Sequence, residues 1–150
     1  MGGDEVNILL PGRNYGWPVV SLGMIYNNTF ASDQSWWRAG MEMPVLYWMP
    51  SISPSSLTFY TGDRFPWWKG HLFLGALNGQ QLQRVAFDQP APQAVRRESL
   101  LTQLDTRIRD VAQGPDGYLY VATEQRPEGA GQPANPEARN GTIRRIEPAE

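Results

Sequence analysis

The chain has 150 residues, no cysteine and a formal net charge of −2 at pH 7. This length can bury a hydrophobic core, and six tryptophans, six tyrosines and five phenylalanines exclude disorder along the whole chain. The 13 basic and 15 acidic residues leave no surplus of positive charge for nucleic acid, and no apolar stretch is long enough to span a membrane. The absence of cysteine excludes disulfides and thiolate chemistry.

Glycine and proline are frequent, with 15 and 13 residues, which favours many short elements joined by turns over a helical bundle. No stretch of about 12 or more residues has a convincing helical period. Short apolar runs instead predict strands over 57–60, 72–74, 82–87, 108–112, 118–123 and 143–146. Residues 27–43 and 125–140 are polar and irregular, and we predict that they form loops.

Two segments of the chain resemble each other. Residues 70–76 (GHLFLGA) match residues 117–123 (GYLYVAT), and each copy is followed by a similar strand, LQRV at 82–85 and IRRI at 143–146. A strand-rich repeat of about 40–50 residues is typical of β-propeller blades. Two unrelated hairpins of a β-sandwich are the alternative. We predict an all-β chain covering about three blades, fewer than the ~4–8 that close a propeller, so the N-terminal blades are expected to be missing.

Three motifs follow one another along the chain. The first joins GGDEVN at 2–7 to GRNYGWP at 12–18, the second is PSISPSS at 50–56 with FYTG at 59–62, and the third is RIRDV at 107–111 with GPDG at 114–117. Together, in this order, they closely resemble the soluble pyrroloquinoline quinone-dependent sugar dehydrogenases of the glucose/sorbosone dehydrogenase family. The aldose sugar dehydrogenase branch is the most similar, and the resemblance covers nearly the whole chain.

The resemblance implies a six-bladed propeller, of which residues 1–150 form the C-terminal part of a single domain. It implies an enzyme that oxidises aldose sugars at C1 to lactones and transfers hydride to pyrroloquinoline quinone (PQQ), with calcium as a second cofactor. The family's catalytic base is a histidine in an early blade, so this chain alone is expected to be inactive. A periplasmic or secreted location is also implied. The electron acceptor stays open, and a non-catalytic propeller module for binding or scaffolding is the alternative function.

Arg107 and Arg109 are the candidate ligands of the cofactor. Residues alternate along a strand, so the two arginines are predicted to share one face, with Ile108 on the other. Two guanidinium groups on one face form a fork for carboxylate or quinone oxygens. The alternative is an exposed strand whose arginines pair with Asp105 or Asp110. The resemblance favours the first interpretation and implies that all of Arg107, Ile108 and Arg109 contact PQQ.

Two further segments are implied to contact the quinone. The first is the turn formed by Leu77, Asn78 and Gly79, where many relatives carry a basic residue and this chain has Asn78. A plain Asn-Gly hairpin turn is an equally good interpretation of this residue. Tyr26 matches a cofactor-contacting tyrosine of the aldose branch, with an ordinary packed aromatic residue as the alternative.

Glu5 and the backbone carbonyl of Tyr15 match a calcium site of the same branch. A carboxylate combined with main-chain oxygens is the kind of ligand set that a hard cation prefers. Two ligands do not complete a calcium site, and Asp4 is a spare candidate. The alternative is that Glu5 merely stabilises a turn.

His71 is the only histidine, and histidine often acts as the base of a dehydrogenase. It occupies the same place in the repeat as Tyr118, so we predict an ordinary blade position and reject His71 as the base. The tryptophans predicted to pack between blades are Trp17, Trp67 and Trp68, while Trp48 stays open between packing and sugar stacking.

Overall fold

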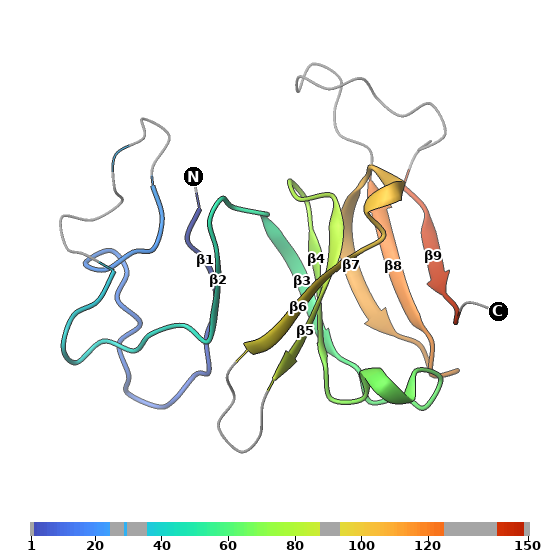
Figure 1. Cartoon of the computed structure of the whole chain (residues 1–150), viewed down its shortest axis with the longest axis horizontal. Coiled ribbons are helices and arrows are strands. Elements are labelled where there is room, and N and C mark those ends of the chain that lie inside the picture. Colours follow the sequence, from blue (N-terminus) through green and yellow to red (C-terminus); the bar gives the residue numbers. More distant parts are fainter. Residues whose placement is uncertain (1, 25–28, 30–35, 88–93, 125–140, 149–150) are drawn as a thin grey trace. The chain divides into compact units, whose positions relative to one another are not determined.

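A computed structural model describes residues 2–24, 29, 36–87, 94–124 and 141–148 (Figure 1). The chain forms two compact units, the first made of Met1–Ile52 with Gln89–Ala94 and the second of Ser53–Asp88 with Val95–Glu150. Nearly all regular structure is β-strand, as the composition predicts. Among the described residues, no helix is long and apolar enough to cross a membrane.

The first unit contains a two-stranded antiparallel sheet. Strand β1 (Asp4–Val6) pairs with β2 (Leu46–Trp48) in the register Asp4 to Trp48. The Asp4 carboxylate accepts hydrogen bonds from the Ser51 hydroxyl at 2.6 Å and from the Ile52 amide at 3.0 Å, which fixes the loop after β2. Asp4, the spare metal-ligand candidate, therefore has a clear structural task.

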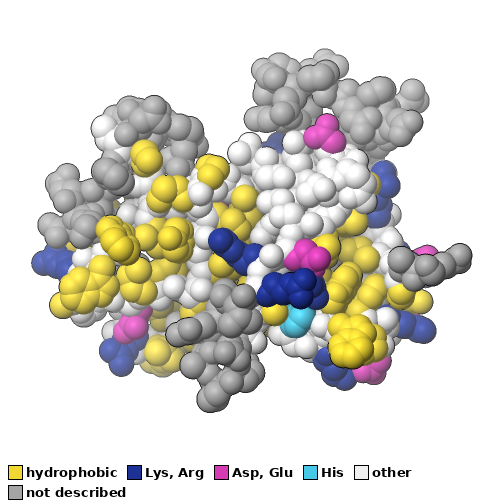
Figure 2. Space-filling view, in the orientation of Figure 1, with side chains coloured by type: hydrophobic (Ala, Val, Ile, Leu, Met, Phe, Trp, Pro, Cys, Tyr) yellow, Lys and Arg dark blue, Asp and Glu magenta, His cyan; other side chains and the backbone are white. Residues whose placement is uncertain are grey.

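Many apolar side chains of the first unit lie on its surface (Figure 2). Trp17 is 70% exposed, and in the second unit Trp67 is 88% exposed, so the prediction that these two indoles are packed is wrong. Trp68 does pack, with its ring stacked on Phe65 at 4.4 Å between centroids. Trp48 is buried in the first unit, which favours packing over sugar stacking for this residue.

The second unit contains two sheets whose strands follow one another in chain order, the arrangement expected of propeller blades (Figure 1). The first sheet holds β3 (Pro54–Phe59), β4 (Leu72–Ala76), β5 (Gln81–Phe87) and β6 (Ala94–Leu100). The second holds β7 (Arg107–Gln113), β8 (Leu119–Glu124) and β9 (Ile143–Ile146). Two short 3-10 helices, η1 (Pro66–Trp68) and η2 (Thr102–Leu104), lie in the connections.

The repeat seen in the sequence corresponds to equivalent strands. β4 and β8 are each the second strand of their sheet, and β5 and β9 are each the third. Gly70 and Gly117 stand at equivalent places before β4 and β8, with φ angles of 82° and 81°. Residues with a Cβ rarely adopt this left-handed backbone, which explains the glycine in both copies. The prediction of an all-β chain covering part of a propeller is confirmed.

The hydrophobic core of the second unit lies between its two sheets. The first sheet contributes Phe73 from β4 and Leu82 from β5, together with Tyr60 and Phe65 from the β3–β4 connection. The second sheet contributes residues of β7 and β8: Ile108, Val111, Leu119 and Val121. Burying apolar side chains of this size from two facing sheets is the main source of stability that the fold offers.

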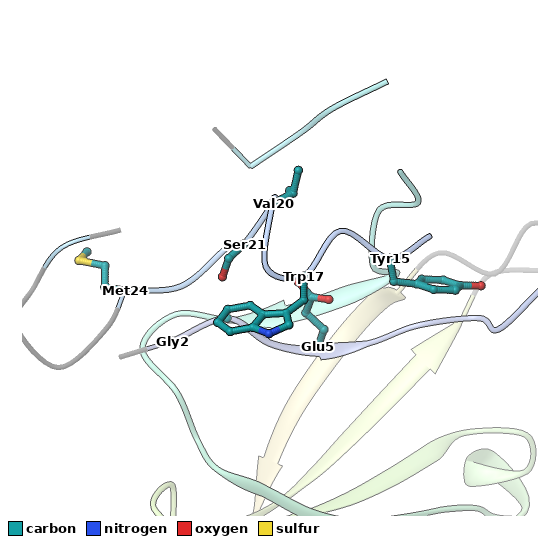
Figure 3. A pocket seen from close by; sticks show the side chains of 8 residues that line it. Gly2, Glu5, Tyr15, Trp17, Val20, Ser21 and Met24 are labelled. Atoms are coloured by element: carbon teal, nitrogen blue, oxygen red, sulfur yellow. The ribbon is translucent and has the colours of Figure 1, made fainter. Parts of the chain in front are cut away.

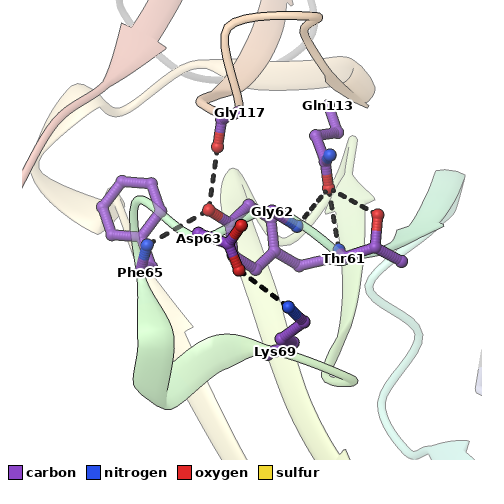
Figure 4. A network of polar contacts seen from close by, with 8 residues as sticks. Thr61, Gly62, Asp63, Phe65, Lys69, Gln113 and Gly117 are labelled. Atoms are coloured by element: carbon purple, nitrogen blue, oxygen red, sulfur yellow. Dashed lines mark hydrogen bonds and ion pairs between the residues drawn. The ribbon is translucent and has the colours of Figure 1, made fainter.

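The Tyr60 hydroxyl connects the two sheets. It donates a hydrogen bond to the carbonyl of Gly117 at 2.8 Å and accepts one from the amide of Phe65 at 3.1 Å. In the same network, Gln113 Oε1 accepts hydrogen bonds from the amides of Thr61 at 2.8 Å and Gly62 at 3.0 Å (Figure 4). The segment after β3 is thereby held against both ends of the turn that joins β7 to β8.

Tyr60→Phe is expected to lower the free energy of unfolding by about 1–3 kcal/mol, because two buried backbone groups lose their common partner. Chemical denaturation of the parent and the variant measures the change. Tyr118→Phe is the matched control, since the described residues provide no hydrogen-bond partner for the Tyr118 hydroxyl. Equal losses in the two variants would contradict a bridging role for Tyr60.

Candidate functional site

Arg107 and Arg109 lie at the start of β7, where the strand is irregular. Arg107 is in register with Glu124 and Ile108 with Thr123, but Ala122 then faces Asp110, so Arg109 is an extra residue in β7. This is the two-against-one count of a β-bulge. Ile108 is buried, whereas Arg107 is half-buried and Arg109 exposed, which agrees with the prediction that the two arginines lie on the face opposite Ile108. The alternation of β7 is interrupted after this point, at the bulge where Arg109 projects.

The bulge also explains the burial pattern of β7. Ile108 and Val111 are three residues apart, yet both are buried in the hydrophobic core. Strict alternation would place residues at this spacing on opposite faces, and the extra residue removes that conflict. Because its side chain is in the core, Ile108 offers a ligand only its backbone groups.

Glu124 is the ion-pair partner of Arg109, and sequence reasoning missed it. Arg109 Nε donates to Glu124 Oε2, with both side chains near the surface at 49% and 36% exposure. This hydrogen bond, and the charges of Arg109 and Arg107, hold the pKa of the Glu124 carboxyl below its usual range. The same bond raises the pKa of Arg109. Glu124 is brought close to Arg109 only by the register between β7 and β8. Pairing residues 107–113 with 119–124 as an antiparallel hairpin would have revealed Glu124 from the sequence.

The expected acidic partners of the arginines behave differently. Asp110 Oδ1 accepts a hydrogen bond from the amide of its neighbour Val111 at 2.9 Å. Asp105 forms the C-terminal end of η2 in a left-handed backbone conformation. Of the alternatives weighed from the sequence, an ion pair on an exposed strand does occur, with Glu124 in place of either aspartate.

Leu77, Asn78 and Gly79 lie in the turn between β4 and β5, which is the hairpin that the Asn-Gly pair predicts. The Leu77 amide donates to the Ser53 carbonyl at 2.9 Å, and the Asn78 side chain is exposed. The turn belongs to the same unit as the arginines, and its contact with PQQ stays a prediction. Tyr26 lies outside the described residues.

The first unit contains a pocket of about 320 Å³ (Figure 3). Figure 3 shows the Glu5 carboxylate beside the Trp17 indole, whereas the Tyr15 ring points away from them. The Tyr15 hydroxyl donates to the Ile8 carbonyl at 2.7 Å, so Tyr15 has its backbone left to offer at the pocket. The residues lining the pocket are Gly2, Gly3, Glu5, Tyr15, Trp17, Val20, Ser21 and Met24.

Glycine backbone builds one wall of this pocket. A Cβ on Gly3 would lie 2.8 Å from the amide nitrogen of Gly23, and a Cβ on Gly23 would lie 2.2 Å from the carbonyl oxygen of Gly2. The two backbone segments therefore approach each other at a distance that only glycine permits. This close approach ties residues 2–3, just before Glu5, to residues 22–23.

Glu5 and Asn7 form a polar pair beside the pocket. Asn7 Nδ2 donates to Glu5 Oε2 at 3.2 Å, and the side-chain oxygen of Asn7 is buried without a hydrogen-bond partner among the described residues. In the described part of the chain, no group of three or more His, Cys, Asp or Glu side chains surrounds a potential metal position. A cation here would need backbone and amide oxygens, which calcium accepts and most transition metals do not prefer.

His71 is partly buried just before β4, and its Nδ1 lies 3.4 Å from a guanidinium nitrogen of Arg84. Burial lowers the pKa of His71, and the charges of Arg84 and Arg96 lower it further. The ring lies beside the Arg84–Glu98 ion pair of β5 and β6. This is a position within a blade, as the repeat predicts.

Comparison with known proteins gives consistent relatives. The sequence model of the Glucose / Sorbosone dehydrogenase family matches residues 1–130. Aldose sugar dehydrogenase YliI from Escherichia coli (strain K12) is 40% identical over 125 residues, which are 83% of this chain and 33% of that protein. A crystal structure of a glucose dehydrogenase has a TM-score of 0.81 at 37% identity and covers 99% of this chain and 39% of the other.

A more distant structure shares the fold. The PQQ-bound form of aldose sugar dehydrogenase from Streptomyces coelicolor has a TM-score of 0.55 at 23% identity, over 81% of this chain and 31% of the other. This chain spans only about a third of the length of the curated relatives that it matches.

Arg109→Ala is expected to raise the pKa of the Glu124 carboxyl toward its ordinary value, because the hydrogen bond that favours the carboxylate is lost. In the parent, the ion pair persists as pH falls through the ordinary range of glutamate and is lost only below the lowered pKa. An NMR titration of the Glu124 side chain measures the difference. Arg144→Ala is the control and should leave this pKa unchanged, and an unchanged value in Arg109→Ala would refute the ion pair.

Proposed function

Because the chain belongs to the glucose/sorbosone dehydrogenase family, we propose that the protein containing it oxidises aldose sugars at C1 to lactones, with PQQ as hydride acceptor. The observation that carries the proposal is the pair of arginines on β7, Arg107 half-buried and Arg109 exposed at the bulge, in a chain whose relatives are named aldose sugar dehydrogenase and glucose dehydrogenase. The PQQ-bound Streptomyces coelicolor structure supports the choice of cofactor through the shared fold.

The guanidinium groups at the bulge suit an anionic ligand. PQQ carries three carboxylates, and Arg107 and Arg109 carry two positive charges beside the carboxylates of Glu124 and Asp110. A carboxylate or quinone oxygen would therefore meet several charged N–H donors at this site. When bound, PQQ supplies the acceptor for the two electrons that leave the sugar.

The turn between β4 and β5 offers a weaker contact. Asn78 has an exposed amide that can donate a hydrogen bond to a carboxylate, without adding charge. We therefore assign Leu77, Asn78 and Gly79 a contact that contributes shape and a hydrogen bond, and we assign the electrostatic part of the site to the arginines.

Glu5 and the backbone carbonyl of Tyr15 are the proposed calcium ligands. The pocket beside Glu5 supports this fit, since the Tyr15 ring is directed elsewhere and the Asn7 side-chain oxygen nearby lacks a partner among the described residues. Carboxylate, amide and main-chain oxygens are the donors that calcium prefers. When bound there, calcium would supply a Lewis acid.

The catalytic base is proposed to come from outside this chain. His71 lies beside the Arg84–Glu98 ion pair at a position within a blade, so we do not assign it that role. The proposed base is a histidine of an N-terminal blade in the longer protein, in line with the greater length of the relatives. We also infer a periplasmic or secreted location for that protein, and its electron acceptor stays open.

Reconstitution of the full-length protein tests the proposed function. The protein without cofactors is incubated with PQQ and calcium, and sugar-dependent dye reduction is followed with glucose and other aldoses. We expect saturable turnover that a calcium chelator abolishes, and no turnover by the isolated 150-residue chain. No turnover by folded full-length protein would favour the non-catalytic module, whereas turnover by the isolated chain would refute the external base.

Arg107→Ala and Arg109→Ala are each expected to weaken PQQ binding by about 10- to 100-fold in the full-length protein, because a charge-assisted hydrogen bond of about 1.5–3 kcal/mol is lost. The corresponding lysine variants should recover only part of the affinity, since lysine lacks the planar fork of donors. A PQQ titration of the cofactor-free proteins measures the effect. Arg144→Ala on β9 is the control, and binding equal to the parent in both alanine variants would make the arginines structural.

A further inference from the structure

We propose that Ser55 and Ser56 are positioning residues for Arg109, and that their hydroxyls hold the bulge of β7 in the shape that presents this arginine to the quinone. The inference rests on the proposed function, because it assigns the serines a role in the same cofactor site. It also rests on a structural feature that is independent of that function, which is the direct bonding of two irregular strand segments to each other.

The first irregular segment is at the start of β3. Pro54 is in register with Ala76, and Leu57 is in register with Leu74. Two residues of β3 therefore lie between these pairs where β4 has one, which is a β-bulge. The extra residue takes Ser55 and Ser56 out of the regular ladder with β4. Their hydroxyls are instead engaged with β7, the first strand of the other sheet.

The second irregular segment is the bulge of β7, and the two serines bond to it on both sides of Arg109. Ser55 Oγ donates to the Ile108 carbonyl at 2.7 Å, and the Val111 amide donates to Ser56 Oγ at 2.8 Å. The Ile108 carbonyl belongs to the peptide group that enters Arg109. The Val111 amide belongs to the peptide group that leaves Asp110, so the hydroxyls hold both ends of the extra loop.

Gly75 on β4 shows how closely this contact is built. A Cβ at Gly75 would lie 2.6 Å from the Ser55 hydroxyl oxygen and 3.1 Å from the Ile108 carbonyl oxygen. Any side chain at this position would therefore displace the hydroxyl from the carbonyl it serves. The glycine leaves the space that the Ser55–Ile108 hydrogen bond occupies.

The two hydroxyls differ in how replaceable they are. The Val111 amide also donates to Asp110 Oδ1 at 2.9 Å, so it keeps one acceptor when Ser56 is truncated. The Ile108 carbonyl loses the Ser55 hydroxyl outright when Ser55 is truncated. We therefore expect Ser55→Ala to have the larger single effect, and the double variant Ser55→Ala/Ser56→Ala to have the largest.

The experiment measures PQQ affinity of the cofactor-free full-length protein by titration. The double serine variant is expected to bind PQQ about tenfold more weakly. Without the two hydroxyls the bulge is less ordered, so Arg109 loses more conformational entropy when PQQ binds. The Ser56→Thr variant keeps a hydroxyl at this position, so its PQQ affinity should be within about twofold of that of the parent. Ser99→Ala removes a β6 hydroxyl that accepts a hydrogen bond from Gln83 and is the matched control.

A double-mutant cycle decides whether the serines act through Arg109. In an Arg109→Ala background the serine substitutions should change PQQ affinity by less than about twofold, because the group they position is gone. The same tenfold loss in both backgrounds would overturn the proposal, since the serines would then act on the fold or on the ligand directly. A lower unfolding temperature with unchanged PQQ affinity would overturn it as well.

Hydrogen exchange at the Val111 amide supplies a readout that does not need the quinone. Without PQQ, this amide should exchange faster in the double serine variant than in the parent or in Ser99→Ala. We call the two serine hydrogen bonds to the bulge the serine clamp. Unchanged exchange of the Val111 amide would refute the serine clamp even if the parent binds PQQ. A parent that binds no PQQ would refute the proposed function together with the role of the serines in PQQ binding. The exchange data would then show whether the serine clamp exists as a structural feature.

Discussion

The hydroxyl of Tyr60 is the contact on which the geometry of the second unit depends. It is fully buried between two sheets, and it serves one backbone group from each of the segments that meet there, Phe65 and Gly117. Apolar packing alone is non-directional and would allow the sheets to slide against each other. A buried hydroxyl with two partners does not allow this, because a shift would leave polar backbone groups unpaired. The register between the sheets is fixed at this end, and the bulge of β7 is held against β3 by Ser55 and Ser56.

Strands that contain a short apolar run could be predicted from the sequence. β3, β4, β5, β7, β8 and β9 were expected nearly where they occur, because each has such a run and turn residues separate the runs. The repeat also predicted which strands are equivalent, since Gly70 and Gly117 answer the same backbone requirement. β6 was not predicted because it includes Arg96, Arg97 and Glu98, so charges rather than apolar residues mark it. β1 and β2 were missed because three residues carry too little pattern.

The face of β7 that carries Arg107 and Arg109 was predictable from the sequence, whereas the bulge and the ion pair with Glu124 were not. The motifs indicated Arg107 and Arg109, but a bulge depends on how many residues the partner strand places opposite, which no single strand reveals. Glu124 likewise becomes a neighbour of the arginines only through the β7–β8 register. For Trp17 the sequence predicted packing that the structure does not show. An aromatic residue in a motif was taken to be packed, and its indole instead lines the pocket beside Glu5.

The pairing of Arg109 with Glu124 bears on how the site would accept an anion. A ligand carboxylate that approaches Arg109 must share or replace the bond to Glu124, so the affinity gained is the difference between two interactions. Both side chains are solvent-exposed to a considerable degree, and ion pairs of this kind contribute little net free energy. Exchange of partners is therefore inexpensive at the side chain, whereas the bulge backbone is held by hydrogen bonds that the ligand does not disturb. The serine hydrogen bonds therefore keep the backbone of Arg109 ordered before the ligand binds. The weak ion pair with Glu124 leaves the guanidinium group able to bind a ligand carboxylate instead.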